Sequence, residues 1–235
     1  MSMNTKKTLA MTFTRKTVPL IATYNIEGED VRRVNSVQDL GVQFDTKLLF
    51  TSHVENVVAK ARKKLGIMRW ILRDFQNANT LMCLYTALVR SHIEYASVIW
   101  NRDRLCTSVM LEGIQRKFIK YSMRRFIPGS EDLSYRELCL AIDLENLEWQ
   151  RKKNDAMFIH SCLHGQITVG ERGIDLIVPT RHFRQFHVFK PVIRSYTSPV
   201  ERSIGSANKL SERMDFFVPV KVFKAKLKSL TEYIF

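Results

Sequence analysis

Two groups of residues in this chain have the types found at catalytic or metal sites: one histidine and cysteine cluster, and the carboxylates. His160, Cys162 and His164 lie within the stretch HSCLH. Two histidines four residues apart share one face of a helix, as they do in half of a zinc site. No second pair of ligands follows at a suitable spacing. We therefore expect these side chains to pack against the fold or to lie at its surface, without a metal.

The carboxylates are not arranged for catalysis by two metal ions. Polymerases and nucleases of that kind hold Mg²⁺ between paired carboxylates, because the ion prefers hard oxygen ligands that it shares with phosphates. The sequence has no Asp-Asp pair and none of the glycine-rich motifs of nucleotide hydrolysis, acyl transfer or dinucleotide binding. We expect no catalytic activity from this chain alone and no cofactor held by it.

The net charge favours a polyanionic partner. Lys and Arg outnumber Asp and Glu by 37 to 23, which gives a net charge of +14. The field of such a molecule attracts nucleic acid, so nucleic acid is the leading partner. An acidic protein or membrane surface, or solubility alone, is the alternative explanation of the charge.

The cysteines and the apolar runs indicate where the protein resides. The four cysteines are widely spaced, without a Cys-x-x-Cys pair, so neither a zinc ribbon nor a disulfide framework is indicated. The first residues lack the apolar core of a signal peptide, and no apolar run approaches the roughly 20 residues that cross a bilayer. We predict a location in the nucleus or cytoplasm, no secretion and no membrane partner.

The elements that must position these residues change type along the chain. Apolar residues alternate with polar ones in much of 9–44, which predicts a small antiparallel sheet, with Gly28 in a hairpin turn that requires a positive φ. From Ser52 the apolar spacing changes to three and four and predicts a helix, with Ser52 and Glu55 as its capping box. The residues of its apolar stripe are Val54, Val57, Val58, Ala61, Leu65, Met68 and Leu72.

Two more helices complete a predicted bundle. The second, Thr80 to about Trp100, is apolar on most of its circumference, so it should be the most buried helix, above all near Leu88. The third runs from Ser108 to Phe126, and Ile127-Pro128-Gly129 ends it. Basic residues flank the stripes of the first and third helices, and the candidate phosphate contacts among them are Lys60, Lys63 and Lys64 on the first and Arg116, Lys117 and Lys120 on the third. The other flanking basic residues are Arg62, Arg69 and Arg73 on the first helix and Arg124 and Arg125 on the third. They are either a solvated face or a surface that follows phosphates.

The rest of the chain predicts a partly irregular block. A capping box at Ser134 and Glu137 starts a short helix, and a longer one runs from about Leu144 to His164. Four prolines predict extended loop and short strand from there to about 219, and helical spacing returns in the tail. Within this loop, seven basic and aromatic residues could stack on bases or pack inward: Arg181, His182, Phe183, Arg184, Phe186, His187 and Phe189. The fold class is thus α+β, mainly α, in three blocks: 1–50, 51–127 and 128–235.

The ordered succession of segments resembles a known family. The segments are MNTKKTLAMTF, YNIEG, DLGVQFDTKLLFTSHV, LYTALVRSHIEYASVIW, LEGIQRKF, LENLEWQRKKNDAMFIHSCLHG, VPTRHFRQ, SPVERS and the surroundings of Asp215-Phe216. In this order they resemble the C-terminal part of the reverse transcriptase of non-LTR (LINE-type) retrotransposons, especially the jockey-like elements of arthropods. The resemblance covers nearly the whole chain.

The resemblance implies roles for these segments. Lys7 matches a lysine at the end of the polymerase palm that assists departure of pyrophosphate. Asp39, Leu40 and Gly41 match the turn of the primer grip, which holds the 3′ end of the growing strand. The helices from Ser52 to Phe126 would be the thumb, which lies along the template–primer duplex, so an RNA/DNA hybrid and an upstream palm are the implied partners.

The same resemblance implies that the polymerase chemistry lies elsewhere. In the family the catalytic aspartates precede the segment that matches this chain, and Mg²⁺ would be held by that upstream palm. We therefore interpret the chain as a C-terminal fragment of an RNA-directed DNA polymerase that is inactive by itself. The alternatives are a host-expressed, stand-alone basic module that binds nucleic acid or protein, and a non-functional remnant.

Overall fold

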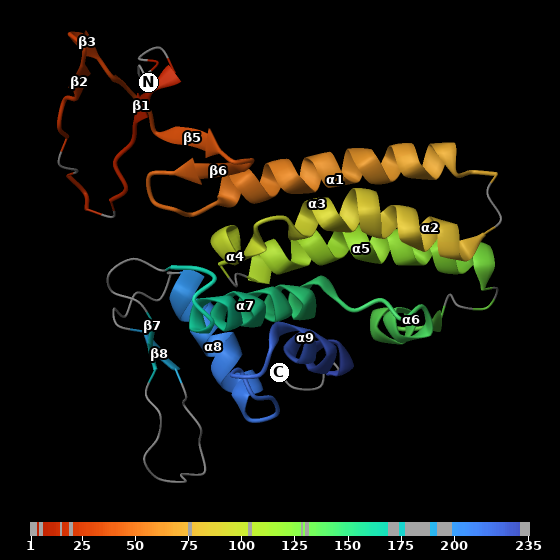
Figure 1. Ribbon diagram of the computed structural model, residues 1–235. Helices are drawn as coiled ribbons and strands as arrows, with labels where there is room; N and C mark the ends of the chain where they lie inside the picture. The colour runs from red at the N-terminus through yellow and green to blue at the C-terminus, as the bar shows by residue number, and fades with distance from the viewer. Residues whose placement is uncertain are drawn as a thin grey trace. The chain divides into compact units, whose positions relative to one another are not determined.

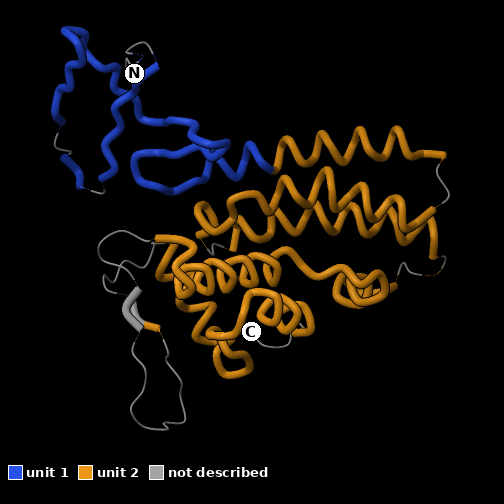
Figure 2. Tube along the Cα trace, in the orientation of Figure 1, with its two compact units in different colours: residues 1–57 blue, residues 58–235 orange. Residues whose placement is uncertain are grey.

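The computed structural model describes residues 4, 7–14, 16–18, 21–74, 77–102, 105–127, 129, 132–168, 174–176, 189–191 and 199–230. The fold is α+β and mainly helical, with small two-stranded sheets near the N-terminus, as the sequence predicts (Figure 1). The chain divides into two compact units, residues 1–57 and 58–235 (Figure 2). No helix in the described part of the chain has both the length and the apolar character needed to cross a bilayer.

The described residues of unit 1 form three separate strand pairs instead of the predicted single antiparallel sheet. Its described strands are β1 (Leu9–Ala10), β2 (Asn25–Ile26), β3 (Glu29–Asp30), β4 (Arg32–Arg33), β5 (Ser36–Asp39) and β6 (Val42–Asp45). The pairs β2–β3 and β5–β6 are antiparallel, but β1 and β4 are parallel. Val31 alone separates β3 from β4, which is too short a connection for β4 to fold back beside β3. The prediction of one antiparallel sheet is therefore wrong.

Both antiparallel pairs turn through two residues with positive φ. Glu27 and Gly28 have φ of 53° and 85°, and the amide of Gly28 donates to Asn25 Oδ1 at 2.9 Å. Leu40 and Gly41 have φ of 44° and 85°. This backbone follows the twist of the flanking strands in a tight hairpin, and glycine adopts it without steric cost. The prediction for Gly28 is confirmed.

The first helix buries the predicted stripe. Helix α1 (Thr51–Ile71) starts one residue before the predicted cap, and its first backbone hydrogen bond runs from Val54 N to Phe50 O. Ser52 therefore lies inside the first turn and not at the cap. The carboxylate of Asp45 holds the preceding loop by accepting from the amides of Leu49 and Phe50 at 3.0 and 2.7 Å. All seven residues of the predicted stripe are buried: Val54, Val57, Val58, Ala61, Leu65, Met68 and Leu72.

The second predicted helix is not continuous. It consists of α2 (Ala78–Tyr85), the π-helical turn η2 (Thr86–Arg90), α3 (Ser91–Glu94), a reversal at Tyr95–Ala96 and α4 (Ser97–Trp100). Four of its buried apolar residues are spaced by four: Leu81, Tyr85, Val89 and Ile93. A π-helical turn takes an additional residue and rotates the following side chains around the axis. Leu88 is thereby 48% exposed, so the prediction that the helix is best buried near Leu88 is wrong.

The remaining elements follow the predicted order with one correction. They are α5 (Leu105–Phe126), α6 (Tyr135–Ala141), α7 (Leu147–Leu163), β7 (Ile174–Leu176), β8 (Phe189–Pro191), α8 (Pro199–Ser211) and α9 (Val220–Ser229). The capping box of Ser134 and Glu137 starts α6 as predicted. Helix α8 occupies a stretch predicted as irregular, because Pro199 lies in the first turn, where a helix tolerates proline.

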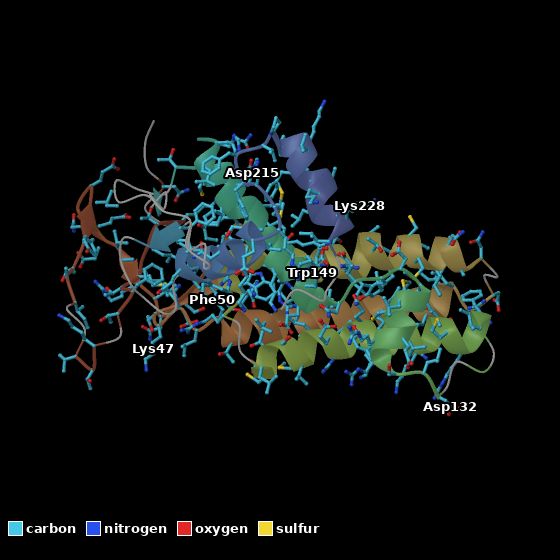
Figure 3. The ribbon with its side chains drawn as sticks, turned by 90° about the horizontal axis from the view of Figure 1, so that it is seen from below. Lys47, Phe50, Asp132, Trp149, Asp215 and Lys228 are labelled. Atoms are coloured by element: carbon cyan, nitrogen blue, oxygen red, sulfur yellow. The ribbon has the colours of Figure 1, made fainter. Side chains whose placement is uncertain are left out.

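Two groups of buried side chains stabilise unit 2. Among the first helices, the rings of Tyr85 and Phe118 stack with centroids 3.8 Å apart. Among the later helices, Trp149 is 2% exposed and belongs to a core that includes Phe189, Phe216 and Phe223. Figure 3 shows Trp149 among the packed helices, whereas Lys228 projects outward from α9. This burial keeps the helices in fixed positions, so the exposed faces of α1 and α5 are defined surfaces.

Candidate nucleic-acid interface

The three lysines predicted as phosphate contacts on α1 are all exposed. Lys60, Lys63 and Lys64 lie outside the buried stripe of the helix. Burial lowers the pKa of His92 on α3, and the charges of Lys64 and Lys60 lower it further. Lys60 and Lys64 are four residues apart and therefore share one flank of α1, and their effect on His92 agrees with α3 lying on that side. Lys63 lies about half a turn from the centre of the stripe, given 3.6 residues per turn.

The three basic residues predicted on α5 are exposed as well, but Arg116 has an intramolecular contact. Its Cζ lies 4.8 Å from the ring centroid of Tyr135, a cation–π contact. Tyr135 donates its phenolic proton to Glu112 Oε2 at 2.7 Å. Burial and the neighbouring Glu112 carboxylate raise the pKa of Tyr135, so the phenol stays neutral. Lys117 and Lys120 of the same helix point to solvent and are the better candidates for phosphate contacts.

Helices α1 and α5 meet at their C-terminal ends, where the sequence predicted no site. Arg125 Nη1 donates to Leu72 O at 2.7 Å and to the hydroxyl of Tyr121 at 3.0 Å. Arg69 Cζ lies 4.6 Å from the ring centroid of Tyr121. The basic residues of α1 therefore do not form one patch: Lys60 and Lys64 lie toward α3, whereas Arg69 lies toward α5.

In unit 1, the residues predicted as a primer grip form the tip of a hairpin. Asp39 pairs with Val42 at the end of β5 and β6, and Leu40 and Gly41 form the turn between them. Leu40 is 84% exposed, so burial does not hold it in place. Its φ of 44° is also unfavourable for a residue with a Cβ atom. Neither burial nor backbone preference explains a leucine here, and strain of this kind often marks functional positions.

Lys7, the predicted palm lysine, is also exposed in unit 1. Its amide donates to Asn4 O at 3.1 Å in a short turn before β1. Its side chain is therefore open to solvent, as a lysine that approaches a phosphate needs to be. None of its contacts with the described residues distinguishes it from an ordinary surface lysine.

His160 and His164 of the histidine and cysteine cluster contact backbone carbonyls. His160 is fully buried, and its Nε2 lies 2.9 Å from Val218 O. His164 Nε2 lies 3.2 Å from Phe216 O, and the two imidazoles stack with centroids 4.1 Å apart. Since a carbonyl oxygen accepts, each Nε2 carries its proton and cannot ligate a metal in this arrangement. His160 therefore packs inside the fold and His164 lies at its surface, which are the two placements that the sequence predicts for this cluster.

The basic and aromatic loop is largely outside the described residues. Residues 181–187 are among those that the structure does not describe. Phe189 is described and is 1% exposed, with its ring 5.2 Å from that of Phe216. It therefore packs inward, so a base-stacking role for Phe189 is ruled out.

Within the described part of the chain, no three His, Cys, Asp or Glu side chains come together as ligands for a metal ion. No protein-family model, curated protein or solved structure matches the sequence. The features that bear on function are the exposed basic faces of α1 and α5 and the exposed hairpin tip of unit 1.

Proposed function

We propose that the chain is a nucleic-acid-binding thumb and connector of a non-LTR retrotransposon reverse transcriptase, with an RNA/DNA hybrid as its partner. The observation that supports this most directly is the group of three exposed lysines on α1, which lie outside a stripe that is buried throughout. The polymerase chemistry and its Mg²⁺ belong to an upstream palm. The function of this chain is to bind the template–primer duplex.

The dimensions of α1 suit a duplex. At about 1.5 Å per residue, its 21 residues extend over roughly 30 Å, close to the ~34 Å of one duplex turn. Lys60, Lys63 and Lys64 occupy little more than one helical turn, so together they would contact neighbouring phosphates. Contacts to phosphates position a protein on the duplex without reading bases. We therefore expect binding with little sequence preference.

The exposed tip of the β5–β6 hairpin suits the role implied for a primer grip. A leucine held outward by a tight turn presents an exposed apolar surface, and Asp39 precedes it in the chain at the end of β5. This part of the proposal depends on the resemblance and on the exposure of Leu40.

A salt titration tests the proposal. The variant Lys60→Gln/Lys63→Gln/Lys64→Gln removes three charges from α1, and Lys224→Gln/Lys226→Gln/Lys228→Gln removes the same number from the exposed side of α9. Each lost phosphate contact lowers the slope of log affinity against log salt by about 0.9 for duplex DNA, and by a similar amount for a hybrid. We expect the α1 variant to flatten the slope by about two to three units and the α9 variant to change it by less than one.

Circular dichroism of both variants is the control that their helices are intact. If the two triple variants weaken binding equally, the charge of the whole molecule and not α1 causes the attraction. If neither variant changes the slope, the lysines of α1 are only a solvated face, and the thumb assignment is wrong.

A further inference from the structure

A hollow opens at the junction of α1 and α5, near the ends of these helices that lie together on the right in Figure 1. Its lining residues are Gly66, Arg69, Trp70, Arg73 and Tyr121, and its volume is about 400 Å³. Pockets for small organic groups have volumes of roughly 300–1,000 Å³. Two arginines and two aromatic rings line the hollow, and none of the five residues is acidic.

Trp70 has no role in packing that would explain its position. Its side chain is 77% exposed, whereas Trp100 and Trp149 are 1% and 2% exposed. It lies on the side of α1 opposite the buried stripe, and Gly66 one turn earlier places no side chain beside it. The indole is therefore available as a flat stacking surface.

The neighbouring groups differ in how firmly they are held. Tyr121 is fixed by Arg69 over its ring, at 4.6 Å, and by Arg125, which donates to its hydroxyl at 3.0 Å. Arg73 pairs with the adjacent Asp74 at 3.4 Å, but both side chains are largely exposed, at 77% and 85%. An exposed pair of this kind is weak, so Arg73 can exchange the carboxylate for a phosphate, which an arginine can bind with two parallel hydrogen bonds.

We infer that this hollow binds an unpaired nucleotide of a single-stranded segment next to the duplex. The base stacks on Trp70, and Arg69 and Arg73 hold the phosphate. Stacking on an aromatic ring beside a basic groove is how proteins bind single strands without reading sequence. Two of the three lysines that the proposed function assigns to the duplex, Lys60 and Lys64, lie on the other flank of α1. The inference therefore rests on the proposed function and adds a second ligand type to the same helix.

Tryptophan fluorescence tests this directly. Because Trp100 and Trp149 are buried, quenching by a nucleic acid reports on Trp70. The probes are a blunt RNA/DNA hybrid and the same hybrid with an overhang of about four nucleotides, a length in the range that one single-strand binding site covers. The overhang should quench the wild-type emission and bind more tightly than the blunt hybrid.

Variants separate stacking from other causes. Trp70→Ala should weaken binding of the overhang hybrid about 5- to 150-fold and leave the blunt hybrid unchanged, whereas Trp70→Phe should keep most of the affinity. Ile67→Ala is the matched control, because Ile67 is an exposed apolar residue of the same helix, at 49% exposure.

The outcomes distinguish the inference from the proposed function. If neither hybrid binds the wild-type chain, the proposed function fails, and the inference fails with it. If the blunt hybrid binds with the expected salt dependence but the overhang adds neither affinity nor quenching, only the inference is overturned. A Trp70→Ala variant that loses self-association in sedimentation while keeping its affinity for the overhang would assign the hollow to protein contact, and would also overturn the inference.

Discussion

Replacing Arg202 by methionine tests what holds the later helices of unit 2 together. Arg202 on α8 donates from Nε and Nη2 to the two carboxylate oxygens of Asp155 on α7, at 3.0 and 2.9 Å. The same guanidinium donates to the carbonyl oxygens of Val98, at 2.5 Å, and of Asn101, at the end of α4. Asp155 is 1% exposed. One side chain thus joins three helices through buried polar contacts.

The expected loss follows from these contacts. Methionine keeps much of the apolar volume but leaves the buried Asp155 carboxylate without its guanidinium, which costs about 3–5 kcal/mol for a buried pair. The carbonyls of Val98 and Asn101 lose a donor, at about 1–3 kcal/mol each where water cannot replace it. These costs are not additive, but the first alone is a large part of the roughly 5–15 kcal/mol that stabilises a domain.

A second variant isolates the charge. In Arg202→Met/Asp155→Leu both partners become apolar, so the buried charge is gone while the two carbonyls still lack their donor. We expect the double variant to be more stable than Arg202→Met and less stable than the wild type. Arg73→Met is the matched control, because the Arg73–Asp74 pair is exposed, and exposed pairs contribute little.

Urea unfolding followed by circular dichroism measures all three variants. The midpoint should fall strongly for Arg202→Met, partly for the double variant and not measurably for Arg73→Met. If Arg202→Met unfolds at the wild-type urea concentration, the cluster does not stabilise unit 2, and the reasoning is refuted. A double variant less stable than Arg202→Met would show that the buried charge is not the main cost.

Two further variants test single elements. Leu40→Asn should stabilise the β5–β6 hairpin by about 1 kcal/mol, because asparagine tolerates the positive φ of 44° at this turn position. Thermal unfolding measures this change. Lys60→Gln/Lys64→Gln should raise the pKa of His92 toward its usual 6.5, as measured by NMR titration, and an unchanged pKa would mean that the lysines are remote. Because the wild-type pKa is lowered in the folded state, His92 should reduce stability as the pH falls below 6.5, and less so in this double variant.

Features set by local sequence were predictable. The stripe of α1 follows from a period of 3.6 residues. Once this stripe is buried, Lys60, Lys63 and Lys64 are exposed, whichever elements pack against the stripe. The capping box of Ser134 and Glu137 is contained within four residues. In both cases the decisive contacts lie within one or two turns of the same helix, so no knowledge of the rest of the fold is needed.

Two kinds of feature were not predictable: a local change from α-helical to π-helical hydrogen bonding, and pairing between segments that are distant in the sequence. The π-helical turn at Thr86–Arg90 moves Leu88 outward, although the apolar pattern on both sides is that of an ordinary helix. The parallel pairing of β1 with β4 joins strands of two residues, which are too short to carry a pattern. Pro199 suggested a break, whereas its position in the first turn of α8 made it compatible with the helix.

The difference between local pattern and tertiary packing also explains why the candidate site was predicted only in part. The periodicity places Trp70 outside the stripe of α1 and so predicts its exposure. It does not predict that Tyr121 lines the same hollow, because that depends on how α5 crosses the bundle. The period of α1 alone puts Lys60 and Lys64 on one flank and Arg69 on the other, but which helix each flank faces, α3 or α5, also depends on the packing of the bundle. A helix with two basic flanks can contact two strands that diverge, because each flank meets a different backbone. If α1 lies where a duplex opens into a single strand, both the lysines and the exposed tryptophan have a reason to be on it.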